Sequence, residues 1–135
     1  MLRDFRPSDQ DAVRRLILSG LRERWGEAFD ASVNPDLSDL VATYVDRGAE
    51  IVVIESDGDI IATGILIAVD DAVGRVVRMS VATAHRRQGL ARRIVDELVR
   101  RARRLGMSEV RVLTDTPWTS AVELYAACGF AEVRR

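Results

Sequence analysis

The sequence contains a strand-like segment that leads through an arginine-rich turn into a helix, and this arrangement suits the binding of a phosphate. Residues 76–81 are rich in β-branched side chains, and residues 86–91 read Arg-Arg-Gln-Gly-Leu-Ala ahead of an amphipathic run. The first amide N–H groups of a helix have no partner within the helix, so they form an anion site. Four arginines beside this helix start add positive charge: Arg86, Arg87, Arg92 and Arg93. The pattern predicts a site for a pyrophosphate or a ribose phosphate.

A second motif lies about thirty residues further along the chain. Residues 120–130 read Ser-Ala-Val-Glu-Leu-Tyr-Ala-Ala-Cys-Gly-Phe, which fits an Ala-x-x-Leu-Tyr-x-x-x-Gly-Phe element. With the Arg-x-x-Gly-x-Ala turn before it, the chain resembles the GNAT superfamily of N-acyltransferases, which use acyl-coenzyme A. The close resemblance covers about residues 75–131, whereas residues 1–74 agree only in the order of their elements.

The resemblance implies a binding site for acetyl-CoA, the cosubstrate of the family. It implies that the strand at residues 79–81 diverges from the strand at residues 110–112, so that backbone groups face the pantetheine arm. The Val81 N–H is then expected at the thioester carbonyl, and the turn amides at the pyrophosphate. The cofactor-binding residues implied in this way are Met79, Ser80, Val81, Arg86, Arg87, Gln88, Gly89, Leu90, Ala91 and Arg92.

The resemblance also assigns Tyr125 to the general acid near the sulfur of the coenzyme. A phenol with an ordinary pKa of about 10 is protonated at neutral pH, and it can donate a proton as the thiolate leaves. The alternative, a helix tyrosine that packs in the core, stays open at this point.

The sequence departs from the family pattern at two positions. Many relatives carry a glutamate base on the strand that here reads Val-Val-Arg at residues 76–78, and an asparagine where this chain has Trp118. Asp30, Glu55 and Asp70 are alternative bases, or the acceptor amine arrives neutral. The spacing selects none of these, so the general base stays unassigned.

Composition narrows the class of protein. The length of 135 residues fits one domain, and a net charge of −1 argues against a nucleic-acid partner. The longest apolar run, residues 60–69, is about half of a membrane span, and no signal-peptide core follows Met1. We therefore expect no membrane partner and a cytoplasmic location. The single histidine, His85, does not supply the several ligands of a metal site, and the single cysteine, Cys128, forms no internal disulfide.

The arginines of the chain cluster in one segment. Residues 86–104 hold eight arginines against two acidic residues. A solvated helix face and a role in phosphate binding are both open for four of them: Arg100, Arg101, Arg103 and Arg104.

Periodicity and turn residues predict the elements that position these groups. Apolar residues at helical spacing predict a helix over residues 8–21, with Ser8 as N-cap, and another over residues 35–47. Asp57-Gly58-Asp59 predicts a hairpin. Further strands are expected at residues 2–6, 50–56, 60–69, 76–81, 109–114 and 130–135, and further helices at residues 89–105 and 117–129. The apolar faces expected in the core include Tyr44, Val45 and Leu105.

Residues 22–34 lack periodicity and form a long connection, which is typical of a functional loop. Its aromatic and charged side chains Arg24, Trp25 and Asp30 are the expected acceptor-binding residues. The acceptor itself is expected to be an amine-bearing small molecule or a peptide.

These observations together predict an α/β fold with a mixed, mostly antiparallel central sheet and about four flanking helices, in one GNAT domain over residues 1–135. The predicted reaction is transfer of the acetyl group of acetyl-CoA to a primary amine, directly and within a ternary complex. The family usually has one more strand after residues 130–135, so either the chain stops before it or a second chain completes the sheet edge in a homodimer. The alternative function is a GNAT-like module that binds coenzyme A as a sensor or oligomerisation domain without turnover.

Overall fold

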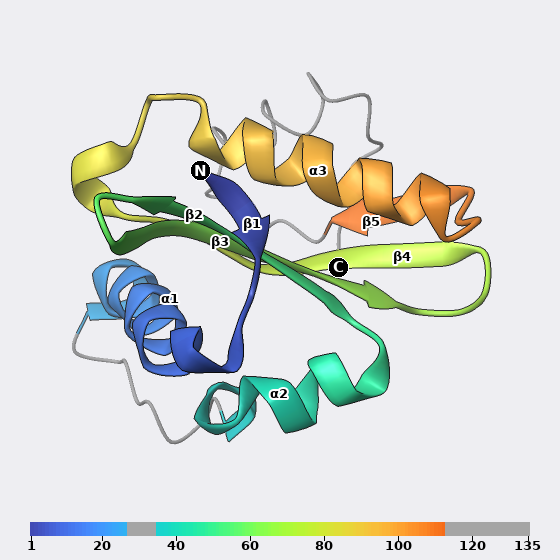
Figure 1. Ribbon diagram of the computed structural model, residues 1–135, viewed down its shortest axis with the longest axis horizontal. Coiled ribbons are helices and arrows are strands. Elements are labelled where there is room, and N and C mark those ends of the chain that lie inside the picture. Colours follow the sequence, from blue (N-terminus) through green and yellow to red (C-terminus); the bar gives the residue numbers. More distant parts are fainter. Residues whose placement is uncertain (27–34, 113–135) are drawn as a thin grey trace.

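A five-stranded mixed sheet forms the centre of the structure, a computed structural model that describes residues 1–26 and 35–112 (Figure 1). The first four strands are antiparallel to their neighbours, and the fifth is parallel to the fourth. In sheet order, which is also chain order, they are β1 (Leu2–Asp4), β2 (Glu50–Ser56), β3 (Asp59–Ala68), β4 (Val73–Val81) and β5 (Glu109–Val112). The predicted α/β fold with a mostly antiparallel sheet is confirmed.

The predicted hairpin between β2 and β3 is confirmed as well. Asp57 and Gly58 have φ values of 52° and 84°, and Ser56 pairs with Asp59 across the turn. Two consecutive left-handed residues match the twist of the flanking strands, and Asp and Gly both tolerate that conformation.

Helices cover both faces of the sheet (Figure 1). One face carries α1 (Gln10–Trp25) and α2 (Leu40–Thr43), and the other carries α3 (Leu90–Arg104). Ile94 and Leu98 of α3 are fully buried on β3, where a Cβ on Gly64 would lie 2.5 Å from Cγ2 of Ile94. The glycine therefore lets α3 pack close to the centre of the sheet.

The opposite core layer is built from the two N-terminal helical segments. Val13 and Ile17 of α1 pack with Leu37 and Leu40 against the sheet, and all four side chains are almost fully buried. Alternate residues of β2 thus pack in the two core layers, because successive side chains on a strand point to opposite faces of the sheet.

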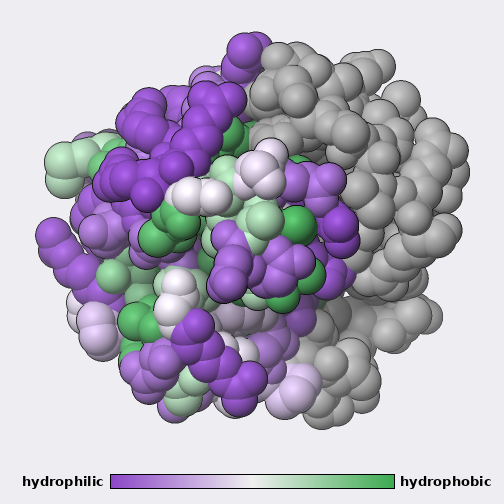
Figure 2. All heavy atoms as spheres, turned by 90° about the vertical axis from the view of Figure 1, so that its right-hand side faces the viewer, coloured by the Kyte–Doolittle hydropathy of each residue, from purple (hydrophilic) through white to green (hydrophobic). Residues whose placement is uncertain are grey.

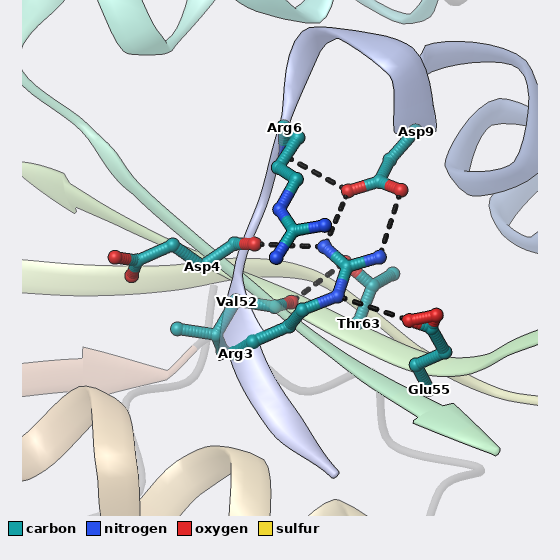
Figure 3. A network of polar contacts seen from close by, with 7 residues as sticks. All are labelled: Arg3, Asp4, Arg6, Asp9, Val52, Glu55 and Thr63. Atoms are coloured by element: carbon teal, nitrogen blue, oxygen red, sulfur yellow. Dashed lines mark hydrogen bonds and ion pairs between the residues drawn. The ribbon is translucent and has the colours of Figure 1, made fainter.

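The start of α1 differs from the prediction. Ser8 is not the N-cap; residues Pro7–Asp9 form a short 3-10 turn, η1, and the Asp9 carboxylate accepts the Arg6 N–H at 2.8 Å. The same carboxylate accepts two hydrogen bonds from Arg3 at 2.7 and 3.0 Å, and Arg3 also donates to Glu55 at 3.2 Å (Figure 3). The hydrogen bonds from Arg3 lower the pKa of Asp9. The Asp9 carboxylate therefore has two roles: it accepts the Arg6 N–H at the turn and binds the largely buried guanidinium of Arg3 from β1.

Two other helix predictions were wrong in their bounds. The four residues 22–25, predicted as a connection, form the last turn of α1. The helix predicted over residues 35–47 is divided into η4 (Pro35–Ser38), α2 and η5 (Val45–Arg47). The break occurs at Asp39, whose extended backbone ends η4 and whose carboxylate accepts the Ala42 N–H at 3.0 Å.

Two residues expected in the core lie at the surface. Val45 is 42% exposed, and Leu105 is 55% exposed because α3 ends at Arg104 and Gly106 turns the chain at a φ of 84°. Figure 2 shows the end of the molecule at which α3 terminates. Hydrophilic residues cover most of the described surface there, with smaller hydrophobic areas between them. The predicted helix 117–129 and strand 130–135 lie outside the described residues.

Candidate active site

The centre of the candidate site is a β-bulge in β4. Thr63 pairs with Ser80 and Ile65 pairs with Val77, so Gly64 of β3 lies opposite two residues of β4, Arg78 and Met79. Arg78 has a φ of 53°, a left-handed conformation that non-glycine residues adopt only rarely. An extra residue in one strand of this kind turns the strand and changes which groups face outward.

The bulge changes which amide groups of β4 bind to β3. Before it, the Val69 N–H bonds to the Val73 carbonyl, which makes the odd-numbered residues of β4 the hydrogen-bonded ones. After it, the Ala82 N–H bonds to the Ile61 carbonyl, so the even-numbered residues are bonded and Val81 is not. The N–H of Val81 therefore points away from β3, towards the side on which β5 lies.

The side chains change faces in the same way. Met79 and Val81 pack in the layer under α3, whereas Ser80 Oγ lies 3.6 Å from the position of a Cβ on Gly20 of α1. Within the described residues, the ladder between β4 and β5 runs from Val73 to Val76 and so stops before the bulge. The three predicted residues 79–81 thus follow the point where the described pairing ends.

The turn after β4 leads into α3 as predicted. It contains the 3-10 turn η6 (Thr83–His85) and two left-handed residues, Arg87 at a φ of 65° and Gly89 at a φ of 76°. Gly89 is the N-cap and has no side chain to cap α3, and no atom lies within 4 Å of the position of a Cβ on it. Among the described residues, no acceptor meets the amide N–H groups of residues 87–92. The donors suit a pyrophosphate, and the space beside Gly89 is open for it.

Arg86 differs from the other residues of this turn because it forms an ion pair with Glu23 of α1. Its guanidinium donates to both carboxylate oxygens of Glu23, at 2.6 and 2.9 Å, and Thr83 Oγ1 donates to the same carboxylate at 3.3 Å. The hydrogen bonds with Arg86 lower the pKa of Glu23, and both side chains are about half exposed. No motif or spacing pointed to Glu23, which lies 63 residues from its partner.

The arginines of the turn and of α3 differ in their exposure. Arg87, Arg92 and Arg93 are exposed near the helix start, and Arg100, Arg103 and Arg104 are exposed towards its end. Arg101 instead bonds to Glu97 at 2.9 Å and to Asp4 of β1 at 2.6 Å, and its side chain is only 13% exposed. Arg101 thus holds α3 to β1 and does not belong to a solvated face.

The bulge residue Arg78 also has a partner from a distant segment. Its Nε donates to Asp36 Oδ2 at 3.0 Å and its NH2 group to Oδ1 at 2.8 Å, and the Tyr44 hydroxyl donates to Oδ2 at 2.6 Å. Burial, followed by the hydrogen bond with Asp36, raises the pKa of Tyr44 to about 12. Sequence reasoning missed this cluster, and the one signal was a single arginine in an otherwise apolar stretch of β4.

The remaining predicted site residues are only partly placed. Tyr125 and Asp30 lie outside the described residues, and Arg24 and Trp25 lie on the last turn of α1 with side chains that are not described. Two of the alternative bases have other partners. Glu55 bonds to Arg3, and Asp70 accepts the N–H groups of residues 72 and 73 in the turn before β4.

Two further features are absent from residues 1–26 and 35–112: a metal site and a membrane-spanning helix. No group of three or more His, Cys, Asp or Glu side chains there is placed to hold a metal ion. No helix in the same ranges has the length and apolar character needed to cross a membrane.

Comparisons with known proteins agree with this geometry. The model of the acetyltransferase (GNAT) family matches residues 11–130. Human N-acetyltransferase 8 is 34% identical over 115 residues, which cover 81% of this chain and 51% of that protein. Rat N-acetyltransferase 8 is 34% identical over 112 residues, with coverage of 78% and 50%. The chain thus spans about half the length of the curated relatives it matches.

Solved structures share the fold. An acetyltransferase of the GNAT family from Staphylococcus aureus Mu50 has a TM-score of 0.89 at 20% identity, and the match covers 100% of this chain and 86% of that one. A Mycobacterium tuberculosis protein solved in complex with CoA has a TM-score of 0.71 at 24% identity, with coverage of 98% and 72%.

The mixed sheet with a bulged fourth strand, followed by the turn into α3, is the fold that this chain shares with the solved acetyltransferase of the GNAT family. The family match over residues 11–130 places the chain in that class: it belongs to the acetyltransferase (GNAT) family, whose members use acetyl-CoA.

Proposed function

We propose that this protein is an N-acetyltransferase that transfers the acetyl group of acetyl-CoA to a primary amine by direct attack within a ternary complex. The observation that carries the proposal is the turn at residues 87–92, where successive amide N–H groups have no acceptor among the described residues. The family match and the structural neighbour in complex with CoA support the choice of coenzyme.

Each part of the turn and of β4 has a role in this proposal. The amides of residues 87–92 bind the pyrophosphate, helped by Arg87 and Arg92. The outward Val81 N–H donates to the carbonyl oxygen of the thioester, where negative charge develops during attack by the amine. Coenzyme A itself supplies the activated acetyl group and the thiolate leaving group.

The proposed general acid is Tyr125, which protonates the departing thiolate. Tyr125→Phe keeps the ring and removes the donor, so kcat should fall by roughly 10-fold to 1000-fold while the affinity for CoA stays the same. Steady-state kinetics with acetyl-CoA, together with calorimetry of CoA binding, measures both quantities. A variant with unchanged kcat, when chemistry is rate-limiting, contradicts the role.

The acceptor is proposed to be an amine-bearing small molecule or a peptide, bound near the end of α1. Arg24, Trp25 and Asp30 are its proposed contacts, because they adjoin or lie in the connection that leads to η4. No nucleic acid is proposed as a partner, since the net charge of the chain is −1.

The release of free thiol from acetyl-CoA in the presence of a panel of amines tests the function directly. The panel should contain amino acids, polyamines, aminoglycosides and short peptides with free N-termini. Amine-dependent thiol release, with the acetylated amine found by mass spectrometry, is the expected result. Tight binding of CoA without turnover on any amine would favour the alternative of a sensor or oligomerisation module. The absence of CoA binding would contradict both.

A further inference from the structure

The bulge of β4 requires a backbone conformation that its own residue disfavours. Arg78 has a φ of 53°, and a left-handed conformation places the Cβ of an L-residue too close to the following carbonyl oxygen. Such conformations persist when the surrounding structure holds them in place. At Arg78 the described surroundings include a carboxylate from another layer of the fold.

Asp36 holds the guanidinium of Arg78 at two points. The two hydrogen bonds, at 2.8 and 3.0 Å, fix both the position and the plane of the guanidinium group. The side chains of Arg78 and Asp36 are only 23% and 19% exposed, so solvent screens the pair less than it screens a surface pair. Asp36 lies on η4, 42 residues from Arg78, and η4 is packed on the sheet through the buried Leu37.

Tyr44 steadies the carboxylate from a second direction. Its hydroxyl donates to Asp36 at 2.6 Å, and its pKa of about 12 keeps it protonated over the working range of an enzyme. Asp36 therefore accepts hydrogen bonds from Arg78 and Tyr44 at any pH near neutrality.

The conformation of Arg78 decides which amide of β4 points towards β5. If β4 paired with β3 without a bulge, its odd-numbered pattern would continue, and the Val81 N–H would bond to β3. With the bulge, the Val81 N–H points away from β3, and none of the described residues accepts it.

We propose that Asp36, held by Tyr44, is a positioning residue for acetyl transfer: it locks Arg78 in the left-handed conformation and so directs the Val81 N–H at the thioester. This inference rests on the proposed function for its link to acetyl transfer, but the lock itself is a property of the fold. Neither Asp36 nor Tyr44 touches the reacting atoms in this role.

Two substitutions of Arg78 separate the backbone role from a role of the guanidinium itself. Arg78→Gly and Arg78→Ala remove the same charged group, but only glycine adopts the left-handed conformation freely. Arg78→Gly should keep kcat/KM for acetyl-CoA near the wild-type value, and Arg78→Ala should lower it by about 5-fold to 30-fold. Asp36→Ala should resemble Arg78→Ala, and the double variant of Asp36→Ala with Arg78→Gly should recover the activity of Arg78→Gly.

The register of β4 gives a readout that does not depend on activity. Ala62 and Val81 form a non-hydrogen-bonded pair, whose Hα atoms are close enough for a strong nuclear Overhauser effect. Wild type and Arg78→Gly should show this contact. In Arg78→Ala and Asp36→Ala it should weaken, and a contact between Ala62 and Ser80 should replace it.

Asp39→Ala is the matched control, because Asp39 is a nearby acid whose carboxylate caps α2 by accepting the Ala42 N–H. It should lower the melting temperature without changing the Overhauser contacts. Should Arg78→Ala not fold, Arg78→Gln replaces it, since glutamine keeps more of the side chain and, unlike glycine or asparagine, disfavours the left-handed region.

The outcomes distinguish the lock from the reaction. Equal loss of activity in Arg78→Gly and Arg78→Ala would show that the guanidinium acts directly and would overturn the proposal, as would an unchanged contact of Ala62 with Val81 in Asp36→Ala. A wild-type protein inactive on every amine would refute the proposed function alone, because the Overhauser contacts still decide whether Asp36 locks the bulge.

Discussion

Gly89 is the residue on which the proposed phosphate binding depends most directly. It caps α3 in the left-handed conformation, and the space that a side chain would fill is open. A side chain there would meet the bound coenzyme instead of the protein. This is why the glycine matters for the ligand more than for packing.

Substitution of Gly89 by glutamate tests this assignment. Gly89→Glu adds both bulk and a negative charge where the pyrophosphate is expected, so the affinity for CoA should fall by roughly 100-fold or more. Isothermal titration calorimetry measures the loss, and far-UV circular dichroism checks the fold.

Gly89→Gln is the matched control, since it has the same size and backbone strain without the charge. It should lose less affinity than Gly89→Glu, and the difference should shrink at high salt. Unchanged CoA binding in Gly89→Glu would show that the turn is not part of the CoA site.

At the scale of elements, the contact between α1 and the phosphate-binding turn joins two parts of the proposed site. Glu23 lies two residues before the end of α1, where the connection to η4 begins, and Arg86 lies in the turn before α3. The Glu23 carboxylate pairs with Arg86, an arginine that was expected to bind the coenzyme. In the proposed complex, Glu23 therefore competes with the coenzyme for Arg86.

Removal of this carboxylate should make CoA bind more tightly. In Glu23→Gln, Arg86 is released, and the affinity for CoA should rise by roughly 2-fold to 5-fold at low salt. Asp11→Asn is the matched control, because it makes the same change of charge at the far end of α1. Calorimetry at two salt concentrations measures the effect. Weaker binding in Glu23→Gln would show that the pair positions the turn rather than competing for it.

For the whole molecule, ion pairs tie the N-terminal strand to the rest of the fold. Arg3 joins β1 to Asp9 and to Glu55 of β2, and Arg101 joins Asp4 to α3 (Figure 3 shows the first group). β1 has only three residues, so these side chains supply much of its attachment.

The pairing of Asp9 predicts a dependence of stability on pH. Its pKa is lowered in the folded state, so its contribution to the free energy of unfolding is fully present above the unfolded pKa of about 3.9 and is lost as the pH falls through the folded pKa. Asp9→Asn should lower the free energy of unfolding by roughly 2–3 kcal/mol at pH 7. The difference from wild type should shrink below a pH of about 4.

Thermal or urea unfolding between pH 7 and pH 2.5 measures this difference. Asp71→Asn, a change at an exposed acid, is the control and should leave the free energy of unfolding almost unchanged at every pH. A difference between Asp9→Asn and wild type that stays constant with pH would contradict the assignment of the acid titration to Asp9.

The sequence by itself determined the features that depend on neighbouring residues. The turn at Asp57-Gly58, the stop of α3 at Gly106 and the glycine that starts α3 follow from backbone conformations that those residues allow. The apolar stripe of α3 identified its buried face for the same reason, because helical periodicity is a local property. The turn into α3 could be located from the sequence since its amide donors come from consecutive residues, and its phosphate binding stays a prediction.

The tertiary structure decided which charged groups meet. Arg78 pairs with a carboxylate 42 residues away and Arg86 with one 63 residues away, and no spacing along the chain specifies either contact. The direction of the Val81 N–H also depends on the register with β3, which one extra residue inverts. A strand pattern read from the sequence gives the alternation of side chains but not the residue at which it changes, because the partner strand and the layer packed on it hold that residue in place.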